Sequence, residues 1–180
     1  MNVYLLLAEG FETIEALAPV DILRRGGIKV KTVSVSNKPY VKSSHGITVA
    51  ADTLLSKLNI SEASALILPG GFPGYKHLCD NPQVGELARQ QFEEGRLLAL
   101  ICGAPTVLKQ FGIATGRSIT CHSSVISEMS DYTYTGKDVE HDGNLITANG
   151  AAHAVDFGLE ILRTLAGEEA ALKVARGMQL

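Results

Sequence analysis

Apolar residues along this chain form short continuous runs in some segments and helical spacing in others. Continuous runs at 2–8, 65–68 and 97–101 are typical of strands buried on both faces of a parallel sheet. Residues 28–35 alternate between apolar and polar, which predicts a strand with one exposed face. Apolar positions at helical spacing between residues 12 and 25 predict a helix that joins the first two strands. This β-α-β opening implies a right-handed crossover and parallel pairing.

The remaining segments continue the same alternation of strands and helices. Pro19 lies inside the first helix, so we expect a kink or a break near it. Further strands are expected near 118–121, 132–134, 137–140 and 145–148, and two short extended pieces within 36–50. Further helices are expected near 53–58, at 81–94, after residue 105, after residue 122, and at 154–166 and 168–177. The pattern predicts a single doubly wound α/β domain over residues 1–180.

Composition and charge narrow the class of protein. Hydrophobic residues make up 46% of the 180 residues and charged ones 19%, which is typical of a globular chain. A net charge of −3 gives no electrostatic reason to expect nucleic-acid binding. The first residues do not have the pattern of a signal peptide, and no apolar run reaches membrane-spanning length. Three cysteines without a Cys-x-x-Cys pair predict reduced thiols in a cytoplasmic protein.

Cys102 stands where a buried strand ends and the next helix begins. Open α/β sheets bind ligands at the carboxyl ends of their strands, and a helix amino terminus favours an anionic side chain. Such a position lowers a thiol pKa from about 8.5 into the range of roughly 3.5 to 7.5. Gly103 permits a sharp nucleophile elbow, so we expect Cys102 to be a φ/ψ outlier. The alternative is an unreactive cysteine packed beneath the helix.

The loops after the parallel strands should meet at this edge of the sheet, and they supply candidate partners for the thiol. Glu12 and Glu15 lie three apart at a helix start, and for Glu12 we favour the role of a helix cap. An amide of Gly70 or Gly71 would contribute to an oxyanion hole. His122 follows a later strand and is either a base at the same place or a structural histidine.

Five motifs occur in order along the chain: Glu-Gly-Phe-Glu-Thr-Ile-Glu (9–15), Pro-Val-Asp-Ile-Leu-Arg-Arg (19–25), Leu-Pro-Gly-Gly (68–71), Leu-Ile-Cys-Gly-Ala-Pro (100–105) and Thr-Cys-His (120–122). Together they resemble the parkinsonism-associated deglycase family, within the ThiJ/PfpI group of the glutamine-amidotransferase-like superfamily. The resemblance covers nearly the whole chain. It implies a flavodoxin-like fold and a homodimer.

The resemblance also implies roles for individual residues. Cys102 matches the reactive nucleophile, Glu15 the carboxyl group that contacts its sulfur, and His122 the nearby histidine. The amides of Gly71 and Gly103 match the oxyanion hole. Four further residues are predicted to line the pocket: His45, Gly70, Arg25 and His153.

Three positions depart from the family pattern. His45 replaces a basic residue near the pocket, which weakens the case for an anionic substrate. Gly150-Ala151-Ala152-His153 replaces a Gly-Pro-Gly-Thr loop, which allows a substrate different from that of the best-known members. Cys121 directly precedes His122, and it is either a core thiol or a resolving thiol for oxidised Cys102.

Two other segments contain side chains of the kind that bind metals, at 77–80 and 138–142. Neither has a zinc or calcium spacing, so we expect no metal site. The resemblance implies that no cofactor is needed.

The resemblance implies a cysteine-dependent, cofactor-independent enzyme of the glyoxalase or deglycase type, acting on methylglyoxal-like aldehydes or glycated substrates and protecting against oxidative stress. In this hypothesis Cys102 forms a hemithioacetal, and a protonated Glu15 and His122 move protons. One alternative is a redox-responsive chaperone or sensor with little turnover. Another is a peptidase-like or amidotransferase-like hydrolase, or a protein of thiazole monophosphate biosynthesis.

Overall fold

The computed structural model describes residues 2–58 and 63–180. Within these residues the main sheet has the strand order β10-β11-β7-β6-β1-β2-β5. Its strands are β1 (Asn2–Leu7), β2 (Lys29–Ser34), β5 (Thr53–Leu54), β6 (Ala63–Leu68), β7 (Leu97–Ile101), β10 (Val139–Asp142) and β11 (Leu145–Ala148). Every neighbouring pair is parallel except the hairpin of β10 and β11. The flavodoxin-like α/β class is thereby confirmed.

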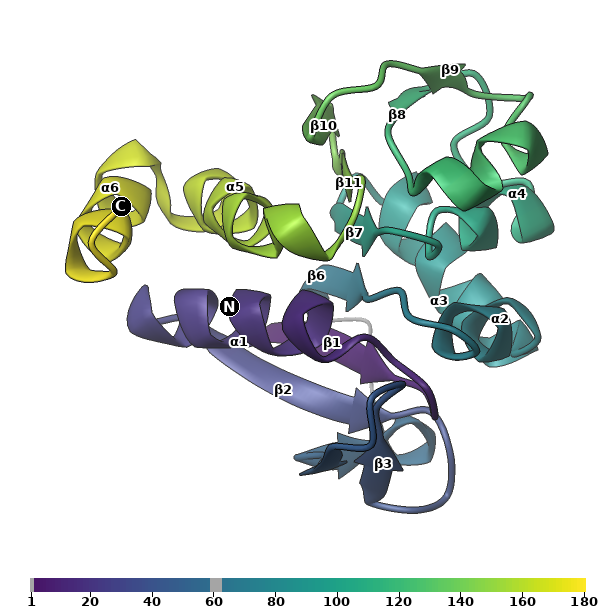
Figure 1. The fold of residues 1–180 in the computed structure, drawn as a ribbon, viewed down its shortest axis with the longest axis horizontal. Coiled ribbons are helices and arrows are strands. Elements are labelled where there is room, and N and C mark those ends of the chain that lie inside the picture. Colours follow the sequence, from purple (N-terminus) through teal and green to yellow (C-terminus); the bar gives the residue numbers. More distant parts are fainter. Residues whose placement is uncertain (1, 59–62) are drawn as a thin grey trace.

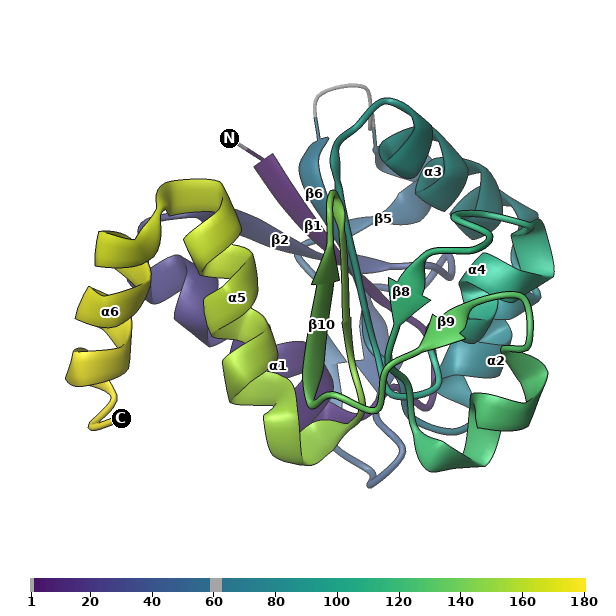
Figure 2. The same ribbon diagram turned by 90° about the horizontal axis from the view of Figure 1, so that it is seen from above.

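Helices cover both faces of this sheet (Figure 1). On one side lie α1 (Thr13–Arg25), α5 (Ala154–Ala166) and α6 (Glu168–Gly177), and on the other α2 (Gly74–Cys79), α3 (Pro82–Glu93) and α4 (Thr106–Phe111). Figure 2 shows the same separation from above. Because side chains alternate along a strand, Leu5 and Leu7 pack on the α1 side, while Leu6 packs on the α3 side. Both faces are therefore apolar, as the continuous runs predict.

Helix α1 differs from the expectation in that Pro19 does not interrupt it. The missing backbone N–H of a proline normally weakens a helix at that point. Here α5 packs closely against α1, since a Cβ atom added at Gly158 would lie 3.1 Å from the Pro19 Cα. Tertiary packing of the two helices keeps α1 continuous. At its start, Glu12 accepts a hydrogen bond from the Glu15 amide at 2.8 Å, which confirms Glu12 as the cap.

The helix expected near residues 53–58 is mostly absent. Thr53 and Leu54 form the edge strand β5, and only Leu55–Lys57 form a short 3-10 helix, η1. Asp52 causes this difference, because its carboxylate accepts from both the amide and the hydroxyl of Thr32 on β2. That attachment draws the following residues into the sheet.

Among residues 2–58 and 63–180, four short strands lie outside the main sheet. β3 (Tyr40–Lys42) and β4 (Thr48–Ala50) form an antiparallel hairpin, and β8 (Ser118–Ile119) pairs in parallel with β9 (Thr133–Tyr134). The strand expected at 118–121 is therefore shorter than predicted and belongs to this small sheet. The chain then continues into the 3-10 helix η3 (Ser123–Glu128), and a further one, η4 (Ala151–His153), precedes α5.

Among the helices of residues 2–58 and 63–180, none has both the length and the apolar character that crossing a bilayer requires.

Candidate active site

Cys102 occupies a strained turn at the carboxyl end of β7. Its φ of 64° lies in the left-handed region, which confirms the predicted φ/ψ outlier. Backbone strain of this kind costs on the order of 1–3 kcal/mol and persists only where neighbours hold it. The Cys102 amide donates to the Ala148 carbonyl and its carbonyl accepts from the His122 amide, both at 2.9 Å. The Thr106 hydroxyl holds the next residue by donating to the Gly103 carbonyl at 2.7 Å.

Glu15 reaches the same place from the first turn of α1. Its side chain is only 1% exposed, and its Oε2 accepts a hydrogen bond from the Gly70 amide at 2.9 Å. A Cβ atom at Gly70 would lie 2.7 Å from both the Cys102 Cβ and the Glu15 Oε2. The absence of a side chain at Gly70 is therefore what allows the thiol and the carboxyl group to meet.

Two backbone amides, those of Gly71 and Gly103, donate toward the Cys102 sulfur. Gly71 has a φ of +92°, and a Cβ atom there would lie 2.1 Å from the Glu12 amide nitrogen. Only glycine fits such a position, because the left-handed conformation and the close backbone both exclude a side chain. The turn after β6 thus brings an amide to the sulfur from a second loop.

The pKa values of Glu15 and Cys102 are both raised, whereas a lowered pKa was expected for the thiol. Burial raises the pKa of Glu15 from its ordinary 4.5 to about 7; the Glu12 charge adds to this, while hydrogen bonds from Cys102 and Gly70 oppose it. Burial, followed by the charge and hydrogen bond of Glu15, raises the pKa of the Cys102 thiol to about 12, against the lowering effect of the two amides. The prediction of a depressed pKa for the Cys102 thiol is therefore wrong.

The Glu15 carboxyl and the Cys102 thiol consequently titrate as a pair. A buried site tolerates one negative charge far better than two adjacent ones. When the proton resides on Glu15, the repulsion disappears and the carboxylic acid becomes a hydrogen-bond donor to the sulfur. The thiolate therefore depends on a protonated Glu15, with the amides of Gly71 and Gly103 as further donors.

A cavity of about 280 Å³ opens onto the sulfur, and we call it the Cys102 cavity. It is lined by Gly71, Phe72, Tyr75, Cys102, Gly103, His122 and Ser124. Phe72 and Tyr75 were not among the predicted site residues; their rings, 6.3 Å apart between centroids, come from the loop after β6 and from α2. The signal in the sequence that could have revealed α2 is the pair of apolar residues Tyr75 and Leu78, which lie three apart. The signal is weak because the helix spans less than two turns.

His122 lines the Cys102 cavity, and its ring also caps a short helix. It caps η3, where its Nδ1 accepts from the Ser124 amide at 3.2 Å and lies 2.8 Å from the Ser124 hydroxyl oxygen. Because Nδ1 accepts a backbone N–H, the proton of the neutral imidazole is on Nε2. Neutral His122 therefore offers a hydrogen-bond donor at Nε2.

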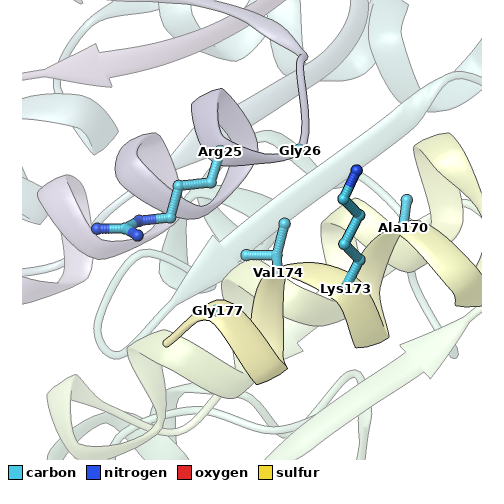
Figure 3. A pocket seen from close by; sticks show the side chains of 6 residues that line it. All are labelled: Arg25, Gly26, Ala170, Lys173, Val174 and Gly177. Atoms are coloured by element: carbon cyan, nitrogen blue, oxygen red, sulfur yellow. The ribbon is translucent and has the colours of Figure 1, made fainter. Parts of the chain in front are cut away.

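Of the four further residues predicted to line the pocket, only Gly70 is at the thiol. Arg25 lies at the opposite end of α1 from Glu15 and lines a separate groove against α6 (Figure 3). His45 is exposed in the turn between β3 and β4, where it contacts the Ser44 hydroxyl at 3.1 Å. His153 lines a cavity next to that of Cys102. These placements correct the predictions for Arg25 and His45, whereas His153 lines a cavity that shares His122 with the Cys102 cavity.

The other two thiols are buried in the core on the α3 side of the sheet, whereas Cys102 packs against the core on the α1 side. Cys79 lies 3.3 Å from the Thr106 hydroxyl oxygen, and burial raises the pKa of both its thiol and that of Cys121. Cys121 thus has the position of the core thiol that was one of its two predicted roles. All three cysteines are free.

The two segments with possible metal ligands have other partners. The His77 ring contacts the Glu9 carbonyl at 2.8 Å. Asp138 accepts from the Asn149 amide and lies 3.3 Å from the His153 ring, while Asp142 pairs with Arg117. Across residues 2–58 and 63–180, no group of three or more His, Cys, Asp or Glu side chains is arranged to hold a metal ion.

Comparison with known proteins places this chain in a family. Residues 1–164 match the profile of the DJ-1/PfpI family. The chain is similar to protein dj-1beta of Drosophila melanogaster, with 38% identity over 96% of this chain and 94% of that protein. The crystal structure of that DJ-1beta superposes with a TM-score of 0.97 at 37% identity, covering 99% of this chain and 97% of the other. The chain is also 36% identical to glutathione-independent glyoxalase DJR-1.2 of Caenorhabditis elegans, over 92% of this chain and 88% of that protein.

Proposed function

The chain belongs to the DJ-1/PfpI family, and on that basis we propose that it is a cysteine-dependent, cofactor-independent enzyme that acts on small reactive aldehydes of the methylglyoxal class. The observation that carries this proposal is the strained Cys102, with its sulfur facing a buried carboxyl group and two backbone amides. A relative named as a glutathione-independent glyoxalase supports the same chemistry.

The reaction begins when the proton of the pair resides on Glu15. The Cys102 thiolate adds to the aldehyde carbon of a 2-oxoaldehyde, a C–S bond forms, and the carbonyl electron pair moves to oxygen. Glu15 donates its proton to that oxygen and becomes a carboxylate, which yields a neutral hemithioacetal. The amides of Gly71 and Gly103 stabilise the oxyanion as it develops.

The second stage moves hydrogen within the bound substrate. The Glu15 carboxylate removes the proton from the former aldehyde carbon, the electron pair forms a carbon–carbon double bond, and the ketone becomes an enediolate oxygen. Glu15 then returns the proton to the neighbouring carbon, while the hydroxyl proton passes to the second oxygen. The first carbon is oxidised and the second reduced, so no external oxidant is needed. Water hydrolyses the resulting thioester to a 2-hydroxy acid and frees Cys102.

A direct assay tests this proposal. Purified protein, treated with chelator and without glutathione, is incubated with methylglyoxal, and loss of substrate and formation of lactate are both measured. Wild type should convert the aldehyde and Cys102→Ser should not. Equal inactivity of the two proteins would refute the enzyme proposal.

A second function, redox sensing, is favoured by the donors around the sulfur. Hydrogen peroxide transfers one oxygen to the thiolate to give a sulfenate and water, and a second hydrogen peroxide converts the sulfenate to a sulfinate and water. The amides of Gly71 and Gly103 and a protonated Glu15 supply hydrogen bonds to the oxygens of that sulfinate. If this is the main function, wild type should suppress aggregation of a client protein without aldehyde turnover, and Cys102→Ala should not.

Glycated proteins or nucleotides, the substrates of a deglycase, would react at the same thiol. The hydrolase alternative has less support, because it needs a carboxylate to orient His122. Among the hydrogen bonds of the described residues, the ring partner of His122 is Ser124.

We also propose that the chain forms a homodimer, as its family resemblance implies. Two large apolar side chains, Ile14 in the first turn of α1 and Ile47 in the β3–β4 hairpin, are 54% and 51% exposed. The two segments are neighbours, since the Ser44 amide donates to the Phe11 carbonyl at 2.8 Å. Light scattering at micromolar concentration should give twice the mass of one chain, and a monomeric mass would refute the dimer.

A further inference from the structure

A second cavity adjoins the Cys102 cavity and shares His122 with it. We call it the outer cavity. It has a volume of about 360 Å³, and its lining includes His122, Ser123, Tyr134, Asn149, Gly150 and His153. These residues come from the start of η3, from β9, and from the loop between β11 and α5. His122 therefore lines both the cavity at Cys102 and a hollow that the reaction steps above do not use.

The sizes of the two cavities indicate that a small dicarbonyl needs only one of them. Methylglyoxal has five non-hydrogen atoms, and at roughly 30 Å³ for each it occupies no more than about 150 Å³. The Cys102 cavity, at about 280 Å³, holds it with room to spare. The outer cavity is thus available to a longer substrate, one that keeps its aldehyde carbon at Cys102 and extends past His122.

The lining of the outer cavity indicates the chemistry of such an extension. Ser123 and Tyr134 carry hydroxyl groups, Asn149 an amide and His153 an imidazole. The His153 ring lies 3.3 Å from Asp138 and 3.7 Å from Asp156, so nearby carboxylates offset any positive charge on it. Neutral donors and acceptors match the hydroxyl groups of a sugar-like chain, whereas an anionic group would meet no uncompensated cation there.

We propose that the outer cavity is a second substrate subsite, which binds the polyhydroxylated tail of a sugar-derived 2-oxoaldehyde while its aldehyde carbon reacts at Cys102. This inference rests on the proposed function and specifies its substrate class. His122 lies at the junction of the two subsites, where its Nε2–H donates to an oxygen of the bound chain. The loop from Asn149 to His153 sets the preference for substrate length.

Gly150 offers a conservative way to narrow the outer cavity beside His122. Its φ of 170° is extended backbone that any residue adopts. A Cβ atom at Gly150 would lie 3.7 Å from the His122 Cδ2, which is ordinary van der Waals contact. Gly150→Ala should therefore fold normally and place a methyl group beside the imidazole. Ala152→Leu adds a larger apolar group to the lining of the same cavity.

The test compares two substrates on the same protein. Values of kcat/KM are measured for methylglyoxal and for a six-carbon sugar-derived 2-oxoaldehyde with a hydroxylated tail, using wild type, Gly150→Ala and Ala152→Leu. Ala170→Leu, the same substitution in the groove between α1 and α6, is the matched control. Thermal melting of each variant shows whether it is folded.

We expect the ratio of kcat/KM for the tailed aldehyde to that for methylglyoxal to fall about tenfold in Ala152→Leu, and less in Gly150→Ala. The ratio should stay at its wild-type value in Ala170→Leu. If wild type turns over methylglyoxal but the ratio is unchanged in both outer-cavity variants, the second subsite is refuted while the enzyme proposal stands. If wild type turns over neither aldehyde, both proposals fail.

Discussion

The two ends of helix α1 each border a hollow of similar size, yet only one has the chemistry of an active site. At its start, Glu15 contacts Cys102 beside a cavity of about 280 Å³. At its end, Arg25 and Gly26 face Lys173 and Val174 of α6 across a groove of about 320 Å³ (Figure 3). Volume alone would favour the groove, so volume does not identify the site.

The difference lies in what each hollow does to its charged groups. Arg25 pairs with Asp21 at 2.7 Å on the surface, and about half of each side chain is exposed. Such exposed pairs contribute little and are readily replaced by water. Glu15, by contrast, is buried beside a thiol on a strained backbone, and its pKa rises to about 7. Perturbed titration together with backbone strain is what distinguishes a candidate catalytic site.

The largest expected effect is on kcat/KM, when the charged residue at one or the other end of α1 is replaced by glutamine. Glu15→Gln removes the proton carrier and should lower kcat/KM for methylglyoxal at least about 100-fold. Arg25→Gln changes a charge in the groove and should leave kcat/KM within about twofold. Steady-state kinetics on both variants provides the measurement. Comparable losses in the two variants would show that the groove takes part in the reaction.

The next effect is on stability as a function of pH. Because the pKa of Glu15 is about 7 in the folded protein and 4.5 ordinarily, the folded state holds a proton that the unfolded chain releases. The stabilisation from this bound proton is complete at a pH below 4.5, the pKa of Glu15 in the unfolded chain. It is lost as the pH rises through about 7, the pKa of Glu15 in the folded protein. The free energy of unfolding should therefore fall by up to about 3 kcal/mol between these limits.

Denaturant titrations of wild type and Glu15→Gln at a series of pH values measure this loss. The Gln variant lacks the titrating group, so its curve should be flatter across the window, and Arg25→Gln should follow wild type. Parallel curves for wild type and Glu15→Gln would mean that the carboxyl group titrates normally in the folded protein.

A smaller effect separates the three thiols. Under limited peroxide, oxygen should appear on Cys102 at least about tenfold faster than on Cys79 or Cys121, because both of these are buried in the core without the donors that face Cys102. Peptide mass spectrometry resolves the three sites, and Cys102→Ser should abolish the fast modification. Glu15→Asp, with its shorter reach, should change which oxidation state accumulates. First oxidation at Cys79 or Cys121 would place the reactive centre elsewhere.

The smallest effect tests the role of His122. Asparagine is a good helix cap, so His122→Asn keeps an acceptor for the Ser124 amide while removing the Nε2–H donor. Loss of one neutral hydrogen bond, about 1 kcal/mol, should lower kcat/KM roughly fivefold. Loss of a general base would cost about 100-fold or more. Kinetics of this variant therefore distinguishes a donor from a base, with thermal melting as the control for the cap.

Features that depend on neighbouring residues in the chain were predictable. The apolar runs located β1, β6 and β7, and the helices at 154–166 and 168–177 have the expected bounds. The elbow at Cys102 followed from a buried strand that ends at a Gly-Ala-Pro break, and Glu12 followed from the preference of acidic residues for helix starts. In these cases the local backbone preference agrees with the tertiary fold.

Features that depend on distant segments were not predictable in the same way. The continuity of α1 at Pro19 needs the close approach of α5 at Gly158, and β5 needs the Asp52 contact with Thr32. The state of the thiol was mispredicted because a helix terminus alone lowers its pKa, whereas burial and Glu15 raise it.

The α/β class, the position of the candidate nucleophile and the residues available around it could be read from local sequence, because hydrophobic period and turn chemistry act over a few residues. Which of those residues meet depends on the tertiary fold. It buried Glu15 against Cys102, turned His122 toward Ser124 as a cap, and placed Arg25 at the far end of α1. Desolvation and hydrogen-bond partnership depend on what surrounds a group in space, and residues as far apart as Glu15 and Gly70 become neighbours only when the sheet assembles.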